Sequence, residues 1–175
     1  GQSVRVGLYA DLARLQAQAL AQGLTLDGSF DVSHAMPVRG VATSGWRGRS
    51  FSFGIADSVT VLAATAAQAD AAASMIANAV NVDHPAIVRQ PAQSLRDMTD
   101  LGDLAVTVDV PPLPAALVQQ ALQAGWQCAR ACQGQGLIAA AVLVCQGQLM
   151  SWALNASERS EQVSFASEAL ALDHH

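Results

Sequence analysis

The chain has 175 residues, of which 51% are hydrophobic and 13% are charged. It is therefore long enough to bury a core of its own and too apolar for a disordered chain. All nine basic residues are arginine and do not cluster, and the net charge is −5, which argues against a nucleic-acid partner. The sequence contains no apolar run of about 18 residues that would span a membrane and no visible signal peptide, so we expect a cytoplasmic protein.

In the first half of the chain, residues 3–10 and 47–54 alternate as strands do, residues 57–64 indicate a buried strand, and an alanine-rich helix follows. Asp11 and Gly23 suit the beginning and end of a short helix, and Thr65 is the expected N-cap of the alanine-rich one. The predicted strands or extended segments are 3–10, 29–33, 37–43, 47–54 and 57–64, and the predicted helices are 11–23 and 65–80.

The second half opens with a loop-rich stretch in which two prolines interrupt regular structure. It ends with two apolar runs separated by Gln146–Gly147, a pair typical of a hairpin turn. The predicted elements are a loop over 83–103, a strand at 104–110, a break at 111–114, a helix over 113–132 and a hairpin over 136–154.

This order of elements predicts an α+β fold, with a largely antiparallel sheet and helices packed on one face. We expect one domain over residues 1–153. The remaining residues, 154–175, contain all three glutamates and predict a polar tail.

The three cysteines favour packing over chemistry. Cys128 and Cys132 are four residues apart on the side of the predicted helix that also carries Leu117 and Ala121, opposite a glutamine-rich face. An odd number of cysteines does not suit a disulfide framework, and buried cysteine behaves as a small hydrophobic residue. We therefore expect core-facing thiols in a reducing compartment, with a metal or redox site as the alternative.

Residues 40–59, GVATSGWRGRSFSFGIADSV, raise the possibility of a ligand-binding loop. The hydroxyls of Thr43 and Ser44, the backbone N–H groups around Gly45 and Gly48, and the guanidinium of Arg47 or Arg49 are the groups that hold a diphosphate in proteins. No standard phosphate-loop motif is present. A glycine-rich hairpin without a ligand is the alternative interpretation.

A second candidate site lies on the predicted helix 65–80. Asp70, Ser74 and Asn78 recur every four residues and so share one stripe of that helix. A carboxylate and a hydroxyl one turn apart are hard oxygen ligands of the kind that Mg²⁺ takes together with phosphates. The alternative is a stripe that only faces water.

These segments resemble a known family. GVATSG followed by ADSVTVLAATAAQADAAASMIANAV is similar to the C-terminal half of the ApbE flavin transferases, which move FMN from FAD onto a protein threonine using Mg²⁺. Residues 4–153 more closely resemble a bacterial family of ApbE-like proteins. The resemblance implies an ApbE-like, T-fold-related architecture.

The resemblance also implies site residues. The A-D-A-x-A-T segment that supplies metal ligands in the transferases is matched by ADAAAS, so that Asp70 takes the place of the aspartate and Ser74 that of the threonine. The transferases' ATSG matches Ala42, Thr43, Ser44 and Gly45. Mg²⁺ and FAD, or another diphosphate, are the cofactors implied.

Two functions remain open. The first is an ApbE-like transferase or ligand-binding relative that takes a flavin dinucleotide or another diphosphate with Mg²⁺. The second is a binding or assembly module without flavin chemistry, which the lack of the transferases' H-x-x-D-P-x-T-G segment favours. Because the chain begins at Gly1 without their N-x-G-G-D segment, we expect a missing N-terminal half-domain or a homo-oligomer among its partners.

Overall fold

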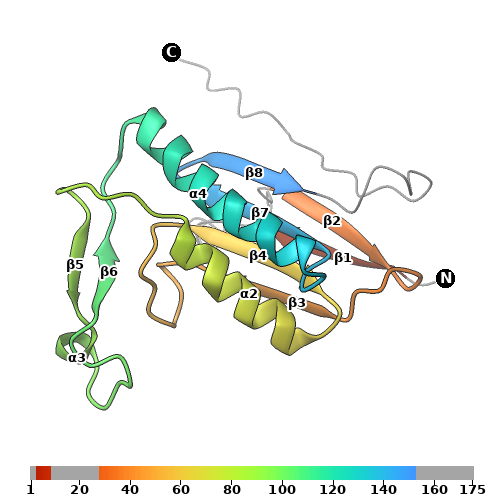
Figure 1. The fold of residues 1–175 in the computed structure, drawn as a ribbon, viewed down its shortest axis with the longest axis horizontal. Coiled ribbons are helices and arrows are strands. Elements are labelled where there is room, and N and C mark those ends of the chain that lie inside the picture. The colour runs from red at the N-terminus through yellow and green to blue at the C-terminus, as the bar shows by residue number, and fades with distance from the viewer. Residues whose placement is uncertain (1–2, 9–27, 153–175) are drawn as a thin grey trace, which may run out of the picture. The chain divides into compact units, whose positions relative to one another are not determined.

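The computed structural model describes residues 3–8 and 28–152 (Figure 1). The predicted helix 11–23 and the predicted tail 154–175 lie outside the described residues. The elements, in chain order, are β1 Ser3–Leu8, β2 Gly28–Ser33, β3 Gly40–Ser44, β4 Ser58–Ala63, α2 Ala66–Ala79, β5 Val88–Pro91, α3 Ala92–Leu95, β6 Ala105–Asp109, α4 Ala115–Gly134, β7 Ala140–Cys145 and β8 Gln148–Trp152.

The contacts divide the chain into two compact units. One spans residues Pro37–Ala153, and the other contains β1 and β2. In this second unit β1 and β2 are antiparallel, and their register pairs Val6 with Phe30 and Arg5 with Asp31. The strand prediction for both segments is therefore confirmed.

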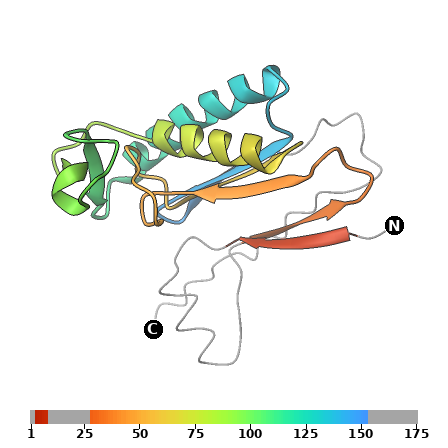
Figure 2. The same ribbon diagram turned by 90° about the horizontal axis from the view of Figure 1, so that it is seen from below.

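The larger unit is built on a four-stranded sheet in the order β3-β4-β7-β8, in which every neighbouring pair is antiparallel. Helices α2 and α4 contact each other and lie together on one side of this sheet (Figure 2). The structure therefore confirms the predicted α+β class. The central strands β4 and β7 are buried at every position.

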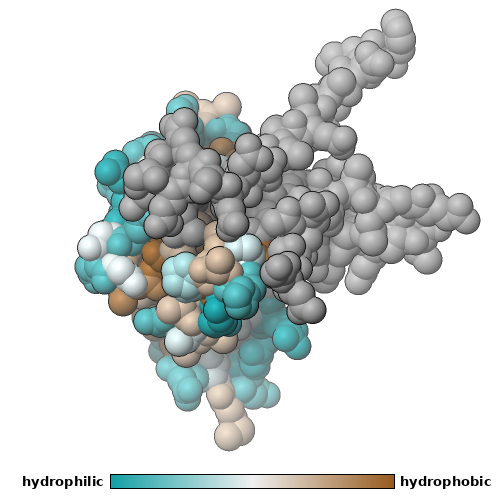
Figure 3. Space-filling model, turned by 90° about the vertical axis from the view of Figure 1, so that its right-hand side faces the viewer, coloured by the Kyte–Doolittle hydropathy of each residue, from teal (hydrophilic) through white to brown (hydrophobic). Residues whose placement is uncertain are grey.

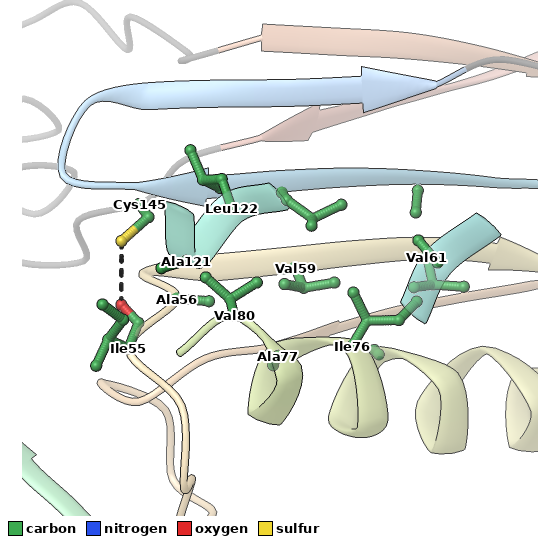
Figure 4. Packing of buried hydrophobic residues seen from close by; sticks show 14 of the residues in the cluster. Ile55, Ala56, Val59, Val61, Ile76, Ala77, Val80, Ala121, Leu122 and Cys145 are labelled. Atoms are coloured by element: carbon green, nitrogen blue, oxygen red, sulfur yellow. Dashed lines mark hydrogen bonds between the residues drawn. The ribbon is translucent and has the colours of Figure 1, made fainter. Parts of the chain in front are cut away.

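The core fills the space between this sheet and its two helices. Val59 and Val61 of β4 and Ile76 of α2 are completely buried, and they belong to one cluster that continues through α4 (Figure 4). Alanines at 69, 72, 73 and 77 form most of the buried face of α2, because small side chains let that helix approach the sheet closely. On the face shown in Figure 3, hydrophilic and hydrophobic surface are mixed over the residues drawn in colour.

The helix α2 begins where the sequence predicts. Thr65 is extended, and its hydroxyl accepts a hydrogen bond from the backbone N–H of Gln68 at 3.2 Å, which satisfies one of the otherwise unpaired donors of the first turn. No described helix combines the length and the hydropathy that a membrane span requires.

The hairpin β7–β8 turns at the predicted pair. Gln146 and Gly147 both have positive φ, 45° and 78°, as a two-residue turn of this kind requires.

Two predictions for local structure are wrong. Residues 47–54 form no strand: Ser52 and Phe53 bond to the Asn78 side chain, and one hydrogen bond joins Ser52 to Thr107 of β6, without a ladder of strand pairs. The stretch 83–103 is not all loop: it contains β5 and α3, and β5 pairs with β6. Proline cannot donate a ladder hydrogen bond, but Pro91 lies at the end of β5, where this costs little. We call residues 88–109, which comprise β5, α3, β6 and the loop between them, the arm (Figure 1).

Candidate functional site

The loop over residues 45–57 connects β3 to β4 and is closed by backbone hydrogen bonds. The N–H of Trp46 donates to the carbonyl of Ala56 at 3.0 Å, and the N–H of Gly48 donates to that of Gly45 at 3.1 Å. At the far end of the loop, the N–H of Ile55 donates to the carbonyl of Val80 at 2.8 Å. The loop is therefore tied both to itself and to the end of α2.

Two glycines of this loop lie where no side chain fits. A Cβ on Gly45 would lie 2.3 Å from the carbonyl oxygen of Asp57, and one on Gly54 would lie 2.0 Å from that of Ala77. These contacts give a packing reason for glycine at both positions. Gly48 is exposed, and its nearest such contact is 3.0 Å, to the Gly45 carbonyl.

The two hydroxyls predicted for the ligand site lie on different faces of the sheet. The Thr43 hydroxyl, on an exposed residue, is 2.8 Å from the hydroxyl of its cross-strand partner Thr60. Ala42 packs against the core beneath the helices, and residues alternate along a strand. Ser44 therefore shares the helix side with Ala42, and Thr43 faces the other way. The structure does not bring the two hydroxyls together.

Arg47 is the predicted site residue with the clearest electrostatic setting. Its guanidinium lies 4.9 Å from the centroid of the Trp46 ring, and its Nε is 3.9 Å from Oδ1 of Asp57. The Arg47 side chain is 48% exposed and that of Asp57 only 11%. Arg47 is therefore held over an aromatic face with half of its surface open to solvent, an arrangement that favours a fixed, accessible cation.

Asp57 links this arginine to the β7–β8 turn. Its Oδ2 accepts a hydrogen bond from the backbone N–H of Gln146 at 2.6 Å. The side chain of Gln146 in turn accepts from the N–H of Leu113 at 2.9 Å and donates to the carbonyl of Pro111 at 2.8 Å. Gln146 thus joins three segments that are distant in the sequence. Sequence reasoning identified it only as a turn residue, and its unusual positive φ is what distinguishes it.

The predicted stripe on α2 separates into two environments. Asp70 and Ser74 are exposed, as metal ligands or water-facing residues would be. Asn78 is half-buried instead, and its Oδ1 accepts hydrogen bonds from the hydroxyl of Ser52 and the N–H of Phe53, both at 3.0 Å. Asn78 therefore anchors the loop, a role that the four-residue spacing did not reveal.

The two candidate sites also differ in position along α2. Its beginning lies against Gly40, where a Cβ would meet the Thr65 carbonyl at 2.1 Å, while its end lies against the loop at Gly54. Asp70 precedes Asn78 by eight residues, about 12 Å of helix. The carboxylate of Asp70 is therefore displaced from the loop end toward the middle of the helix.

The cysteine prediction for α4 is confirmed. Cys132 is buried in the core cluster, and Cys128 is half-buried and packs against it. Burial, and then the neighbouring Cys132, raise the pKa of the Cys128 thiol. Within residues 32–151, no group of three or more His, Cys, Asp or Glu side chains could hold a metal ion by itself.

Comparison with known proteins identifies the family of this chain. No curated protein and no solved structure matches the chain. The family model described as AbpE bacteria matches residues 1–151. Since the match covers most of the 175 residues, the chain belongs to this bacterial family.

Proposed function

We propose that this protein binds a diphosphate-containing small molecule, a flavin dinucleotide or another nucleotide, at the loop 45–57 and the end of β3. The observation that carries the proposal is Arg47, a half-exposed guanidinium positioned by Trp46 and Asp57. Arginine matches the geometry of phosphate oxygens through its paired N–H donors. A cation that is already oriented loses little conformational entropy when an anion binds.

Mg²⁺ is proposed as the second component, held by Asp70 and Ser74. The helix supplies one carboxylate and one hydroxyl, and an octahedral ion would take its remaining ligands from water and from the phosphates. Asp70 is exposed, so that its carboxylate is accessible to an ion. Because it is displaced along the helix from Arg47, a ligand that touches both must be extended, as a dinucleotide is.

The experiment is a calorimetric titration of pyrophosphate, ATP and FAD, each with and without Mg²⁺. Arg47→Ala should weaken binding about tenfold, or about 1.4 kcal/mol, with or without the metal. Asp70→Asn should weaken the binding of FAD, the extended ligand, by a similar factor only when Mg²⁺ is present, and Ser74→Ala should act in the same direction but less, because a hydroxyl carries no charge. Arg130→Ala on the exposed side of α4 is the matched control for a lost positive charge.

Wild type that binds none of these ligands would overturn the proposal. Binding that is unchanged by Asp70→Asn in the presence of Mg²⁺ would remove the metal part alone and leave Asp70 as a water-facing residue.

A second candidate function is a module for assembly, without flavin chemistry. It is favoured by the exposed apolar side chains of the arm: Val88, Leu95, Met98 and Leu104 are each at least 42% exposed, and Met98 is fully so. In sedimentation analysis, an assembling chain should increase in mass with concentration, and Leu104→Asn should suppress the increase. A constant monomer mass over the accessible concentration range would exclude self-assembly.

A further inference from the structure

The arm contributes an arginine to the loop 45–57. Arg96 follows α3, and its Nη2 donates a hydrogen bond to the carbonyl oxygen of Arg49 at 3.1 Å. The same guanidinium lies 4.9 Å from the centroid of the Phe51 ring. Two independent contacts therefore fix this cation against the loop, although 47 residues separate it from Arg49 in the sequence.

The loop segment beneath Arg96 is itself held on two sides. The carbonyl of Ser52 accepts a hydrogen bond from the N–H of Thr107 in β6 at 2.8 Å. The hydroxyl of Ser52, a residue that is only 2% exposed, donates a hydrogen bond to Oδ1 of Asn78 in α2. Phe51, the residue before Ser52, therefore provides Arg96 with a rigid platform.

Arg49 and Arg96 form no ion pair with a carboxylate of the described residues. Among the described residues, the ion pair within 4.0 Å on this loop is that of Arg47 with Asp57, and neither Arg49 nor Arg96 forms one. Both are exposed. An anion bound beside Arg96 would therefore neutralise a guanidinium that no carboxylate of the described residues pairs with.

We propose that Arg96, together with Arg49, forms an anion subsite that receives the second phosphate of a diphosphate ligand whose first phosphate is bound by Arg47. The inference rests on the proposed function and extends it, because it names a residue of the arm as part of the site. The hydrogen bond to Arg49 uses only one of the five N–H donors of Arg96. The remaining donors are available to phosphate oxygens.

The arm also carries acidic groups, which lower the positive electrostatic potential around Arg96. Asp97 and Asp100 are exposed on the loop after Arg96, and Asp103 accepts a hydrogen bond from the side chain of Gln93. Charges at the surface are screened over about 10 Å in 0.1 M salt. The aspartates therefore reduce the positive potential without cancelling the direct contacts that Arg96 makes.

The test compares pyrophosphate with orthophosphate at constant ionic strength, with FAD as a third ligand. Arg96→Ala should weaken pyrophosphate binding about tenfold and leave orthophosphate binding at Arg47 nearly unchanged, so that the preference for the diphosphate is lost. Phe51→Leu, which keeps Arg96 but removes its platform, should produce a smaller loss in the same direction. Arg130→Ala controls for the overall charge, and a thermal melt of each variant controls for folding.

The outcomes separate the two proposals. If wild type binds no phosphate compound, the proposed function and this inference both fail. If wild type binds pyrophosphate and Arg96→Ala binds it equally well, or loses no more than Arg130→Ala does, only the Arg96 subsite is overturned. An equal loss for orthophosphate and pyrophosphate would also overturn it, since Arg96 would then not distinguish the second phosphate.

Discussion

At the scale of single residues, Cys145 shows how a buried thiol is accommodated beside the loop. It is completely buried at the end of β7, and its S–H donates to the carbonyl of Ile55 at 3.4 Å. Burial, and then the charge of nearby Asp57, raise the pKa of Cys145 to about 12. The thiol therefore stays protonated in the folded chain at a pH where an unfolded cysteine has already ionised.

This raised pKa predicts a loss of stability in alkaline solution. Between about pH 9 and pH 12 the unfolded chain binds fewer protons at this position than the folded chain does, so the free energy of unfolding should fall as the pH rises, by at most about 1.4 kcal/mol per pH unit. Urea unfolding at pH 8 and pH 10 measures the effect. Cys145→Ala should be less stable at pH 8, because it leaves a cavity, but should lose less between the two pH values. Equal losses for variant and wild type would contradict the prediction.

Asn78 offers a second test at this scale. Asn78→Ala removes the acceptor of two hydrogen bonds and leaves the O–H of buried Ser52 without the acceptor it donates to, which should cost about 2 kcal/mol or more. Asn78→Asp keeps an acceptor oxygen of the same reach and should retain much of that stability. Denaturant midpoints compare the two variants, and equal destabilisation by both would mean that the hydrogen bonds to Ser52 and Phe53 contribute little.

At the scale of elements, the sequence predicts what depends on local pattern. The cap at Thr65, the turn at Gln146–Gly147 and the buried strand β4 are each encoded within a few residues, and all three are confirmed. The segment 47–54 alternates regularly in the sequence, yet it forms no strand. Its partners, Asn78 and Thr107, are 25 or more residues away from the residues they bond, and alternation carries no information about them.

In the candidate site too, local sequence identifies some residues but not the contacts between distant segments. Arg47 and Asp70 could be named from composition and resemblance, whereas the contact between Arg96 and Arg49 depends on how the arm folds back. The hydroxyls of Thr43 and Ser44 are neighbours in sequence, and for that reason a strand places them on opposite faces.

The close approach of α2 to the loop predicts a steep cost for a single methyl group. Gly54→Ala would place a Cβ 2.0 Å from the backbone carbonyl of Ala77, so that backbone must move. The cost should be about 3 kcal/mol or more. Gly134→Ala at the end of α4, where nothing lies within 4 Å, is the matched control and should be neutral or slightly stabilising. Thermal melts of both variants check this, and a Gly54→Ala protein as stable as wild type would contradict the packing described for the loop.

At the scale of the whole molecule, the methionine side chains differ widely in how much of their surface is exposed to solvent. Met98 is fully exposed in the arm, Met75 is 55% exposed on α2, and Met150 is half-buried against the core. Under mild peroxide treatment Met98 should be oxidised first, Met75 next and Met150 last. Peptide mass spectrometry gives the order. Oxidation of Met98 alone should leave the melting temperature unchanged, and a large shift would show that this side chain is covered in solution.

The pairing of β4 with β7 also has a consequence for how the chain folds. Val59 pairs with Leu143, so the two central strands of the sheet are contributed by segments about 80 residues apart. Long-range pairing of this kind slows folding, because a large loop must close before the pairing is rewarded. At synthesis rates of about 5–20 residues per second, β4 leaves the ribosome some seconds before its partner exists. During that interval β4 pairs with β3 and contacts α2, but the edge that later pairs with β7 is unpaired. We therefore expect the nascent chain to aggregate most readily when it ends between the arm and α4.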